Sequence, residues 1–304
     1  MNAGMRGTVK LALRLCVSSA LITWFLFHYD LKELLGVFGG LALSVWLLGC
    51  AMYLAAQVLS SVRWWILAES LDFEGPWRSF LSLYFIGMYF NLFLPTGLGG
   101  DVFKVHFLSR VNGERMRAAF TVLGDRLAGL IAMVLLGLGA VCAGPSLLPR
   151  KLVVALLCAA AVLAVAMVVL PFLFRSAERW RPKLAERMAP LLVLRKKPVA
   201  LAKVIGLSFF LQALGMGTVA LLGRGLGIGV SLNFYFAAVP LVVLLTLLPV
   251  SFNGIGIREG AFVFFFGLQG VRPEASLALA LLSFSIQVTV SLIGGILYAV
   301  GAHR

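Results

Sequence analysis

Charged side chains are scarce in this sequence. They make up 12% of its 304 residues, whereas hydrophobic residues make up 61%. Soluble proteins carry about 25% charged and 45–50% apolar residues, so no soluble core of this size can bury so much apolar surface. The composition excludes a soluble protein and predicts an all-α integral membrane protein that crosses the bilayer several times.

The residues and motifs of most catalytic centres are also few or missing. The chain has three histidines, which are scattered and form no metal-ligand cluster. GxSxG and Walker motifs are absent. The cysteines lie inside apolar runs without CxxC spacing, so we expect buried small hydrophobes and no disulfide or zinc framework: Cys16, Cys50, Cys142 and Cys158. The sequence therefore predicts no metal, no cofactor and no enzymatic activity.

Acidic residues are outnumbered by basic ones, 12 against 26, and the net charge is +14. Such a charge can indicate a nucleic-acid partner, but the chain has no soluble basic module to carry one. The lysines and arginines gather in short loops between apolar runs, as expected for orientation in a membrane and for contact with anionic head groups. We therefore predict no nucleic-acid binding.

Two stretches interrupt the apolar runs with proline, glycine and charge. Residues 248–260 read Leu-Pro-Val-Ser-Phe-Asn-Gly-Ile-Gly-Ile-Arg-Glu-Gly, and residues 94–104 read Leu-Pro-Thr-Gly-Leu-Gly-Gly-Asp-Val-Phe-Lys. Each begins with Leu-Pro and ends on neighbouring charges of opposite sign. Irregular backbone and ionisable side chains beside membrane-length apolar runs indicate a site for a polar ligand.

The apolar runs predict one transmembrane domain over residues 1–304 with six full spans and two re-entrant hairpins. The expected spans are an N-terminal run ending at Phe27 and residues 41–62, 118–142, 152–174, 204–222 and 275–300. Residues 79–117 and 234–272 are expected to enter the membrane from opposite sides and return, as an inverted pair. This arrangement places most basic residues and both termini in the cytoplasm.

Two further features belong to this topology. Arg63, Trp64 and Trp65 follow the second expected span and are suited to the head-group layer. Residues 175–203 form a basic cytoplasmic loop, part of which we expect to lie on the inner surface as an amphipathic helix. Its lipid-facing residues would be Leu184, Met188, Leu191 and Leu192.

Three motifs together resemble one family. They are Asn91 with Pro95-Thr96-Gly97, Gly99-Gly100 and Asp101; Asp125-Arg126 with Gly129-Leu130; and Leu248-Pro249 with Ser251, Asn253-Gly254, Gly256 and Arg258-Glu259-Gly260. The chain resembles the flippase-like membrane domain of lysylphosphatidylglycerol synthases and its stand-alone relatives. The resemblance implies a bacterial inner-membrane protein that binds a lipid and carries it between leaflets. The soluble aminoacyl-transferase domain of the full synthases has no counterpart here, so aminoacylation of phosphatidylglycerol is not expected.

The motif residues have a direct chemical interpretation. Glycines let a head group approach backbone N–H groups, and those N–H groups at the start of a half-helix attract a phosphate. Arg258 can clamp phosphate, and Glu259 can pair with Arg258 or bind a cationic or hydroxyl-rich head group. The candidate binding residues are Asn91, Thr96, Gly97, Gly99, Gly100, Asp101, Lys104, Asp125, Arg126, Ser251, Asn253, Gly254, Gly256, Arg258 and Glu259.

Structural roles are open for the same residues. Asp125 and Arg126 can pair with loop charges or with each other and lock the hairpins, and Asp101 and Lys104 can cap the first hairpin at the inner surface. The polar side chains near each proline can satisfy freed backbone groups instead of a ligand: Asn91, Thr96, Ser251 and Asn253.

Transport of an anionic phospholipid or a polyprenyl-phosphate-linked lipid is the leading functional hypothesis. One alternative is a non-transporting partner or anchor of a lipid- or glycan-modifying enzyme, which would dock on the basic loop. Another is an integral-membrane lipid transferase that acts through Asp101, Asp125 or Glu259. A homo-oligomer is compatible with each hypothesis.

Overall fold

The computed structural model describes residues 31–93, 99–112, 114–144, 148–180, 197–248 and 250–302, together with residues 16, 19 and 23. Within these ranges the chain is helical and contains no β-strand. The helices are α2 (Leu31–Gly39), α3 (Leu43–Ser70), α4 (Trp77–Phe93), α5 (Gly99–Asn112), α6 (Arg115–Ala143), α7 (Arg150–Trp180), α10 (Pro198–Gly225), α11 (Leu232–Thr246), α12 (Ile257–Gly267) and α13 (Pro273–Ala299). The predicted all-α class is confirmed.

Four of the described helices, α3, α6, α10 and α13, are long and apolar enough to cross a membrane. At 1.5 Å per residue each is about 40 Å long, which exceeds the roughly 30 Å of a hydrocarbon core. They match four of the six expected spans, and α7 covers a fifth. Of the first expected span the structure describes only residues 16, 19 and 23, which are helical. The protein is thus a polytopic helical membrane protein.

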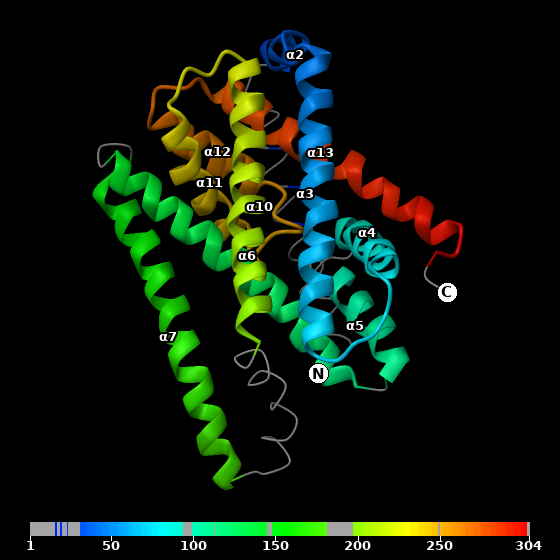
Figure 1. Cartoon of the computed structure of the whole chain (residues 1–304). Helices are drawn as coiled ribbons and strands as arrows, with labels where there is room; N and C mark the ends of the chain where they lie inside the picture. Colours follow the sequence, from blue (N-terminus) through cyan, green and yellow to red (C-terminus); the bar gives the residue numbers. More distant parts are fainter. Residues whose placement is uncertain are drawn as a thin grey trace.

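The helices α3 and α10 form a central antiparallel pair (Figure 1). At one end, Gly225 of α10 lies against Val45 of α3, because glycine has no side chain to keep the two helices apart. Toward the other end, the Arg63 guanidinium of α3 reaches the Ser208 hydroxyl of α10. The residue numbers rise along one helix as they fall along its neighbour, so the two chain directions are opposite.

The helices α3, α4, α5 and α6 recur in the same order as α10, α11, α12 and α13, each set running long, short, short, long. Each packed pair within the first set has its counterpart in the second: α4 with α5 and α11 with α12, α5 with α6 and α12 with α13, α3 with α6 and α10 with α13. Contacts between the sets correspond too, since α4 packs on α13 while α11 packs on α6. The two described sets therefore share one packing plan.

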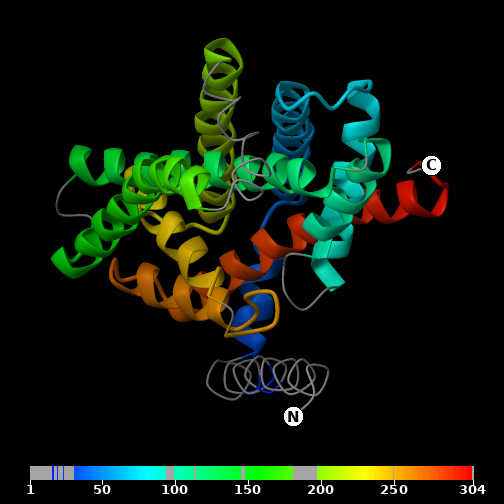
Figure 2. The same ribbon diagram turned by 90° about the horizontal axis from the view of Figure 1, so that it is seen from below.

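The short helices form two hairpins, α4–α5 and α11–α12, which lie at opposite ends of the molecule (Figure 1; Figure 2). Glycines permit the contacts of these hairpins with the long helices of the other set. A Cβ on Gly294 of α13 would lie 1.9 Å from the backbone oxygen of Phe85 on α4. A Cβ on Gly137 of α6 would lie 3.0 Å from the ring of Pro240 on α11. Each hairpin therefore packs against a long helix of the other set, α4 against α13 and α11 against α6.

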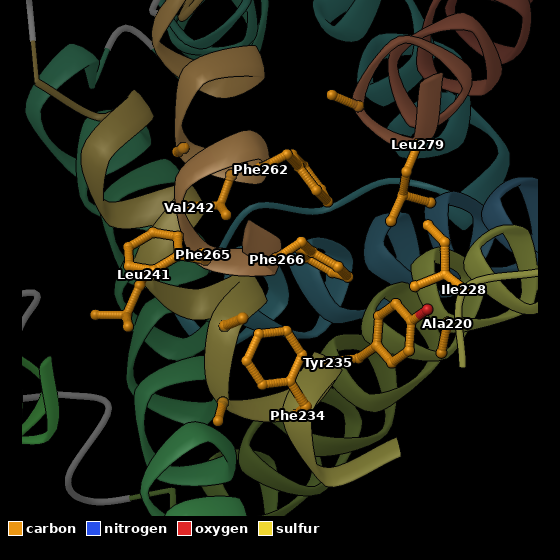
Figure 3. Packing of buried hydrophobic residues seen from close by; sticks show 14 of the residues in the cluster. Ala220, Ile228, Phe234, Tyr235, Leu241, Val242, Phe262, Phe265, Phe266 and Leu279 are labelled. Atoms are coloured by element: carbon orange, nitrogen blue, oxygen red, sulfur yellow. The ribbon is translucent and has the colours of Figure 1, made fainter. Parts of the chain in front are cut away.

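The largest apolar core lies among α10, α11, α12 and α13. The aromatic rings of Tyr235, Phe262 and Phe266 point toward one another at its centre (Figure 3). A second core, around Trp64 and Phe80, packs α3 against α4 and α6. Burying these rings fixes the long helices against the hairpins, which positions the polar residues described below.

The structure corrects the expected end of the second span. The helix α3 does not end at Val62 but continues to Ser70. Arg63 and Trp64 are 5% and 0% exposed, so both lie inside the protein among neighbouring helices. The apolar residues that follow Arg63 extend the buried face of the helix past the charge, and Asp125 on α6 provides a partner for it.

Two other expectations concern the cysteines and the basic loop. Cys16, Cys142 and Cys158 are exposed rather than buried, and Cys50 is partly buried. Of the basic loop expected over residues 175–203, the first residues extend α7 and the last belong to α10. The expected amphipathic helix, including Leu184 and Met188, lies outside the described residues.

Candidate functional site

The α4–α5 hairpin closes through backbone contact and one side-chain hydrogen bond. The Asn91 amide oxygen accepts the backbone N–H of Gly100 at 2.8 Å. A Cβ on Gly100 would lie 1.8 Å from the backbone oxygen of Gly87, so no other residue fits there. Asn91 thus satisfies backbone at the start of α5, where Gly99 is the first residue. Thr96 and Gly97 lie outside the described residues.

Asp101 and Arg126 form a bidentate ion pair between α5 and α6. The Arg126 Nε and Nη2 groups donate to the two Asp101 carboxylate oxygens at 2.9 and 3.1 Å. The carboxyl side chain is only 12% exposed, whereas the arginine side chain is 46% exposed. Arg126 therefore pairs with a charge at the first glycine loop, as one of the sequence hypotheses expected, and about half of its side chain is exposed.

Asp125 faces a different partner, because adjacent helical residues point about 100° apart. Its carboxylate accepts from the Arg63 Nε at 2.8 Å, and both side chains are buried. The Arg63 Nη1 group donates to Ser208 of α10 at 2.9 Å. Asp125 and Arg126 are thus not paired with each other, and Asp125 does not pair with a loop charge. The Arg63–Asp125 pair joins α3, α6 and α10.

Lys104 is buried, with 5% exposure, next to the Asp101–Arg126 pair. Its ammonium lies 3.6 Å from the centre of the Tyr84 ring and 5.2 Å from that of Trp64. Among the described residues, no carboxylate forms an ion pair with it. A desolvated cation–π contact contributes about 2 kcal/mol, whereas burying a charge costs several kcal/mol. The aromatic rings therefore compensate the ammonium only in part.

The α11–α12 hairpin has left-handed backbone at three positions just before α12. Asn253, Gly254 and Gly256 have φ angles of 50°, 75° and 86°. Such angles are open to glycine and tolerated by asparagine, which explains these residue types at these places. The Glu259 carboxylate accepts the backbone N–H of Gly256 and so caps the start of α12.

Arg258 does not pair with Glu259, although the sequence suggested that pairing. Its guanidinium lies 4.5 Å from the centre of the Phe284 ring on α13, and its Nη2 group donates to the Asn253 carbonyl at 3.3 Å. The buried Nη1 group has no hydrogen-bond partner among the described residues, and the same holds for the buried Ser251 hydroxyl. The α11–α12 turn thus holds two polar groups whose hydrogen bonds are unfilled.

Tyr53 of α3 connects the two polar regions. Arg126, from the first region, and Arg258, from the second, both lie within electrostatic range of its phenol group. One cation from each polar region therefore influences this phenol group. Tyr53 lies in an ordinary apolar run, so no sequence pattern singles it out.

Sequence reasoning also missed Arg63, Ser208 and Phe284. The signal for Arg63 was the apolar run that continues beyond it, since a charge inside a long apolar helix needs a buried partner. Ser208 and Phe284 carry no such signal, because serine and phenylalanine are ordinary residues of membrane helices. Their roles depend on which helices lie beside them.

The profile of the lysylphosphatidylglycerol synthase TM region matches residues 11–295. The chain belongs to this family. Neither the curated proteins nor the solved structures contain a significant match. Family membership and the membrane-length helices together indicate an integral membrane protein with a lipid-related role.

The site of this lysylphosphatidylglycerol synthase TM-region protein is rich in hydrogen-bond donors. Among the described residues, no group of three or more His, Cys, Asp or Glu side chains is placed to hold a metal ion. The donors without partners are a guanidinium N–H and a hydroxyl, and the ammonium of Lys104 has only aromatic neighbours. Such groups bind anions, and in a membrane the most abundant anion is the lipid phosphate.

Proposed function

We propose that this protein binds the phosphate of a membrane lipid at the α11–α12 turn and carries the head group between the leaflets of the bacterial inner membrane. The observation that supports this best is the pair of buried, unpartnered groups at the turn, the Arg258 Nη1 and the Ser251 hydroxyl. A buried donor without a partner costs about 1–3 kcal/mol, and more when it is charged. A phosphate oxygen would supply the missing acceptor.

Arg258 is suited to exchange partners with a ligand. It is held by an aromatic ring and one long hydrogen bond rather than by a carboxylate. Glu259 is engaged at the backbone of Gly256, so a phosphate need not displace it. The phosphate also meets the start of α12, where the helix dipole favours negative charge.

The architecture supports movement as well as binding. The two helix sets share one packing plan, and α3 and α10, which hold corresponding places in them, run in opposite directions. We interpret the sets as an inverted repeat, with α4–α5 and α11–α12 as re-entrant hairpins that face opposite leaflets. In such repeats, rocking of one half against the other exposes a central site to each side in turn. The acyl chains would remain in lipid while the head group crosses beside Tyr53.

The substrate class follows from the same groups. Neutral and cationic donors select a phosphate, and both an anionic phospholipid and a polyprenyl-phosphate-linked lipid carry one. We propose binding and transport because the groups at the turn without partners are hydrogen-bond donors suited to hold a phosphate.

A leaflet-exchange assay in liposomes tests the proposal. Purified protein would be combined with head-group-labelled phosphatidylglycerol, phosphatidylcholine or polyprenyl phosphate. We expect accelerated exchange of one class, reduced about tenfold or more in Arg258→Ala, because a charge-assisted hydrogen bond contributes about 1.5–3 kcal/mol. Exchange equal to that of protein-free liposomes for every lipid would refute transport.

Two control variants test whether the loss of lipid exchange is specific to Arg258. Lys203→Ala removes a cation from the exposed side of α10 and should leave exchange unchanged. Glu259→Gln keeps an oxygen that can accept the Gly256 N–H, so its exchange should stay near that of the wild type. If Glu259→Gln were as slow as Arg258→Ala, the Glu259 carboxylate would act on the ligand and not only as a helix cap.

A further inference from the structure

The polar region at the α4–α5 hairpin carries an excess positive charge. Arg63, Arg126, Asp101 and Asp125 all lie within electrostatic range of Lys104. The two arginines are paired with the two carboxylates, one to one. Lys104 is therefore the unmatched member of the group, and it is 5% exposed. Its positive charge adds to the potential around Arg126.

Arg126 has hydrogen-bonding capacity left over. Asp101 occupies its Nε and Nη2 groups along one edge of the guanidinium. A guanidinium has five N–H donors, so the Nη1 edge remains for another acceptor. The Arg126 side chain is 46% exposed, and its Nη1 group is not among the buried atoms without a partner, so this edge is accessible to a further acceptor.

We propose that the open edge of Arg126 is a second anion site, which takes a phosphate group and is distinct from the turn that contains Arg258. Asp101 orients the guanidinium, and Lys104 acts as a positioning residue that supplies the uncompensated positive charge. This inference rests on the proposed function, because the phosphate is taken to belong to the same class of lipid. Arg126 of α6 and Arg258 of α12 then each offer a cation to a phosphate, and both lie within electrostatic range of Tyr53.

The two sites have a common design. Lys104 on α5 and Arg258 on α12 are both held against aromatic rings, those of Tyr84 and Phe284. Aromatic faces keep a cation in place without neutralising it. At the second site the Asp101 carboxylate holds Arg126, and the charge of the nearby Lys104 offsets that of the carboxylate.

Binding of short-chain phosphatidylglycerol tests the second site. The full-length protein would be titrated in detergent and bound lipid counted by native mass spectrometry, with diacylglycerol as the phosphate-free control. We expect two tightly bound lipids in the wild type, one in Arg258→Ala, one in Lys104→Met and none in the double variant. Lys203→Met, on an exposed face, should retain both.

The stability of Lys104→Met separates a binding role from a packing role. Methionine fills a similar volume and removes an under-compensated charge, so its melting temperature should equal or exceed that of the wild type. A lower melting temperature with two lipids still bound would show that Lys104 only packs against Tyr84, and the second site would be wrong.

The outcomes also distinguish this inference from the proposed function. If Arg258→Ala binds no lipid while Lys104→Met binds as the wild type does, the Arg258 site stands and the second site fails. If Lys104→Met loses all binding and Arg258→Ala loses none, the second site stands and the α11–α12 turn is not the binding site.

Discussion

Buried cations in this protein differ by the partner that holds them. Arg63 faces the Asp125 carboxylate, whereas Lys104 and Arg258 lie against aromatic rings. A carboxylate neutralises a cation and fixes two helices together, but an aromatic ring leaves the charge available. The Arg63–Asp125 pair thus joins helices, whereas the charges of Lys104 and Arg258 have no carboxylate in an ion pair with them among the described residues.

The Arg63–Asp125 pair should behave as a structural unit. Arg63→Met alone leaves Asp125 buried without its partner, and we expect a loss of about 3–5 kcal/mol of stability. Ser208 also donates to the Val204 carbonyl, so it keeps one hydrogen bond in this variant. Thermal unfolding in detergent is the measurement.

The double variant Arg63→Met, Asp125→Leu provides the control for this pair. Apolar residues of similar volume replace a buried ion pair at little cost, so most of the stability should return. A double variant as unstable as the sum of the two single variants would contradict the structural role.

At the scale of elements, glycines decide how closely the helices approach. Gly100 brings α5 onto α4 at Gly87, and Gly294 brings α13 onto Phe85 of α4. These contacts place Asp101 within reach of Arg126 and keep Lys104 beside Tyr84. The hairpin geometry and the charge arrangement therefore depend on each other.

Substitution of Gly100 tests this dependence. In Gly100→Ala the new Cβ would meet the Gly87 carbonyl, so the hairpin must open, and we expect a loss at or above the upper end of overpacking costs, about 3 kcal/mol. Gly215→Ala is the matched control, because nothing lies within 4 Å of that position and alanine favours a helix by up to about 1 kcal/mol. Equal melting temperatures for the two variants would show that the close approach is not needed.

At the scale of the whole molecule, the antiparallel α3–α10 pair determines which loops lie together. Asp72, just after α3, pairs with Arg117 near the start of α6 and with Lys197 just before α10. These residues therefore share one side of the molecule. The end of α10 and the start of α3 share the other side, where Gly225 lies against Val45.

Cysteine labelling tests this orientation. In a chain with its four native cysteines replaced, Glu74→Cys and Gly229→Cys would each be treated with an impermeant thiol reagent in intact cells. Both positions are exposed. We expect labelling at position 229 and none at position 74 until the cells are opened, because basic residues gather near position 74. Labelling of both from outside would contradict the antiparallel spans.

The sequence by itself determined the class of the protein, the approximate helices and the two glycine turns. Long apolar runs require helices in a membrane, and Leu-Pro with clustered glycines interrupts them, so these features follow from local chemistry. The candidate residues Asp101, Lys104, Arg126 and Arg258 were visible because charge is rare in such runs.

Only the tertiary structure decided the partners. It placed Arg63 opposite Asp125, engaged Glu259 at the backbone of Gly256, and set the rings of Tyr84 and Phe284 against cations. Hydropathy records how deeply a residue can be buried but not which helix lies beside it. That choice depends on close contacts between residues far apart in the chain, which no local pattern encodes.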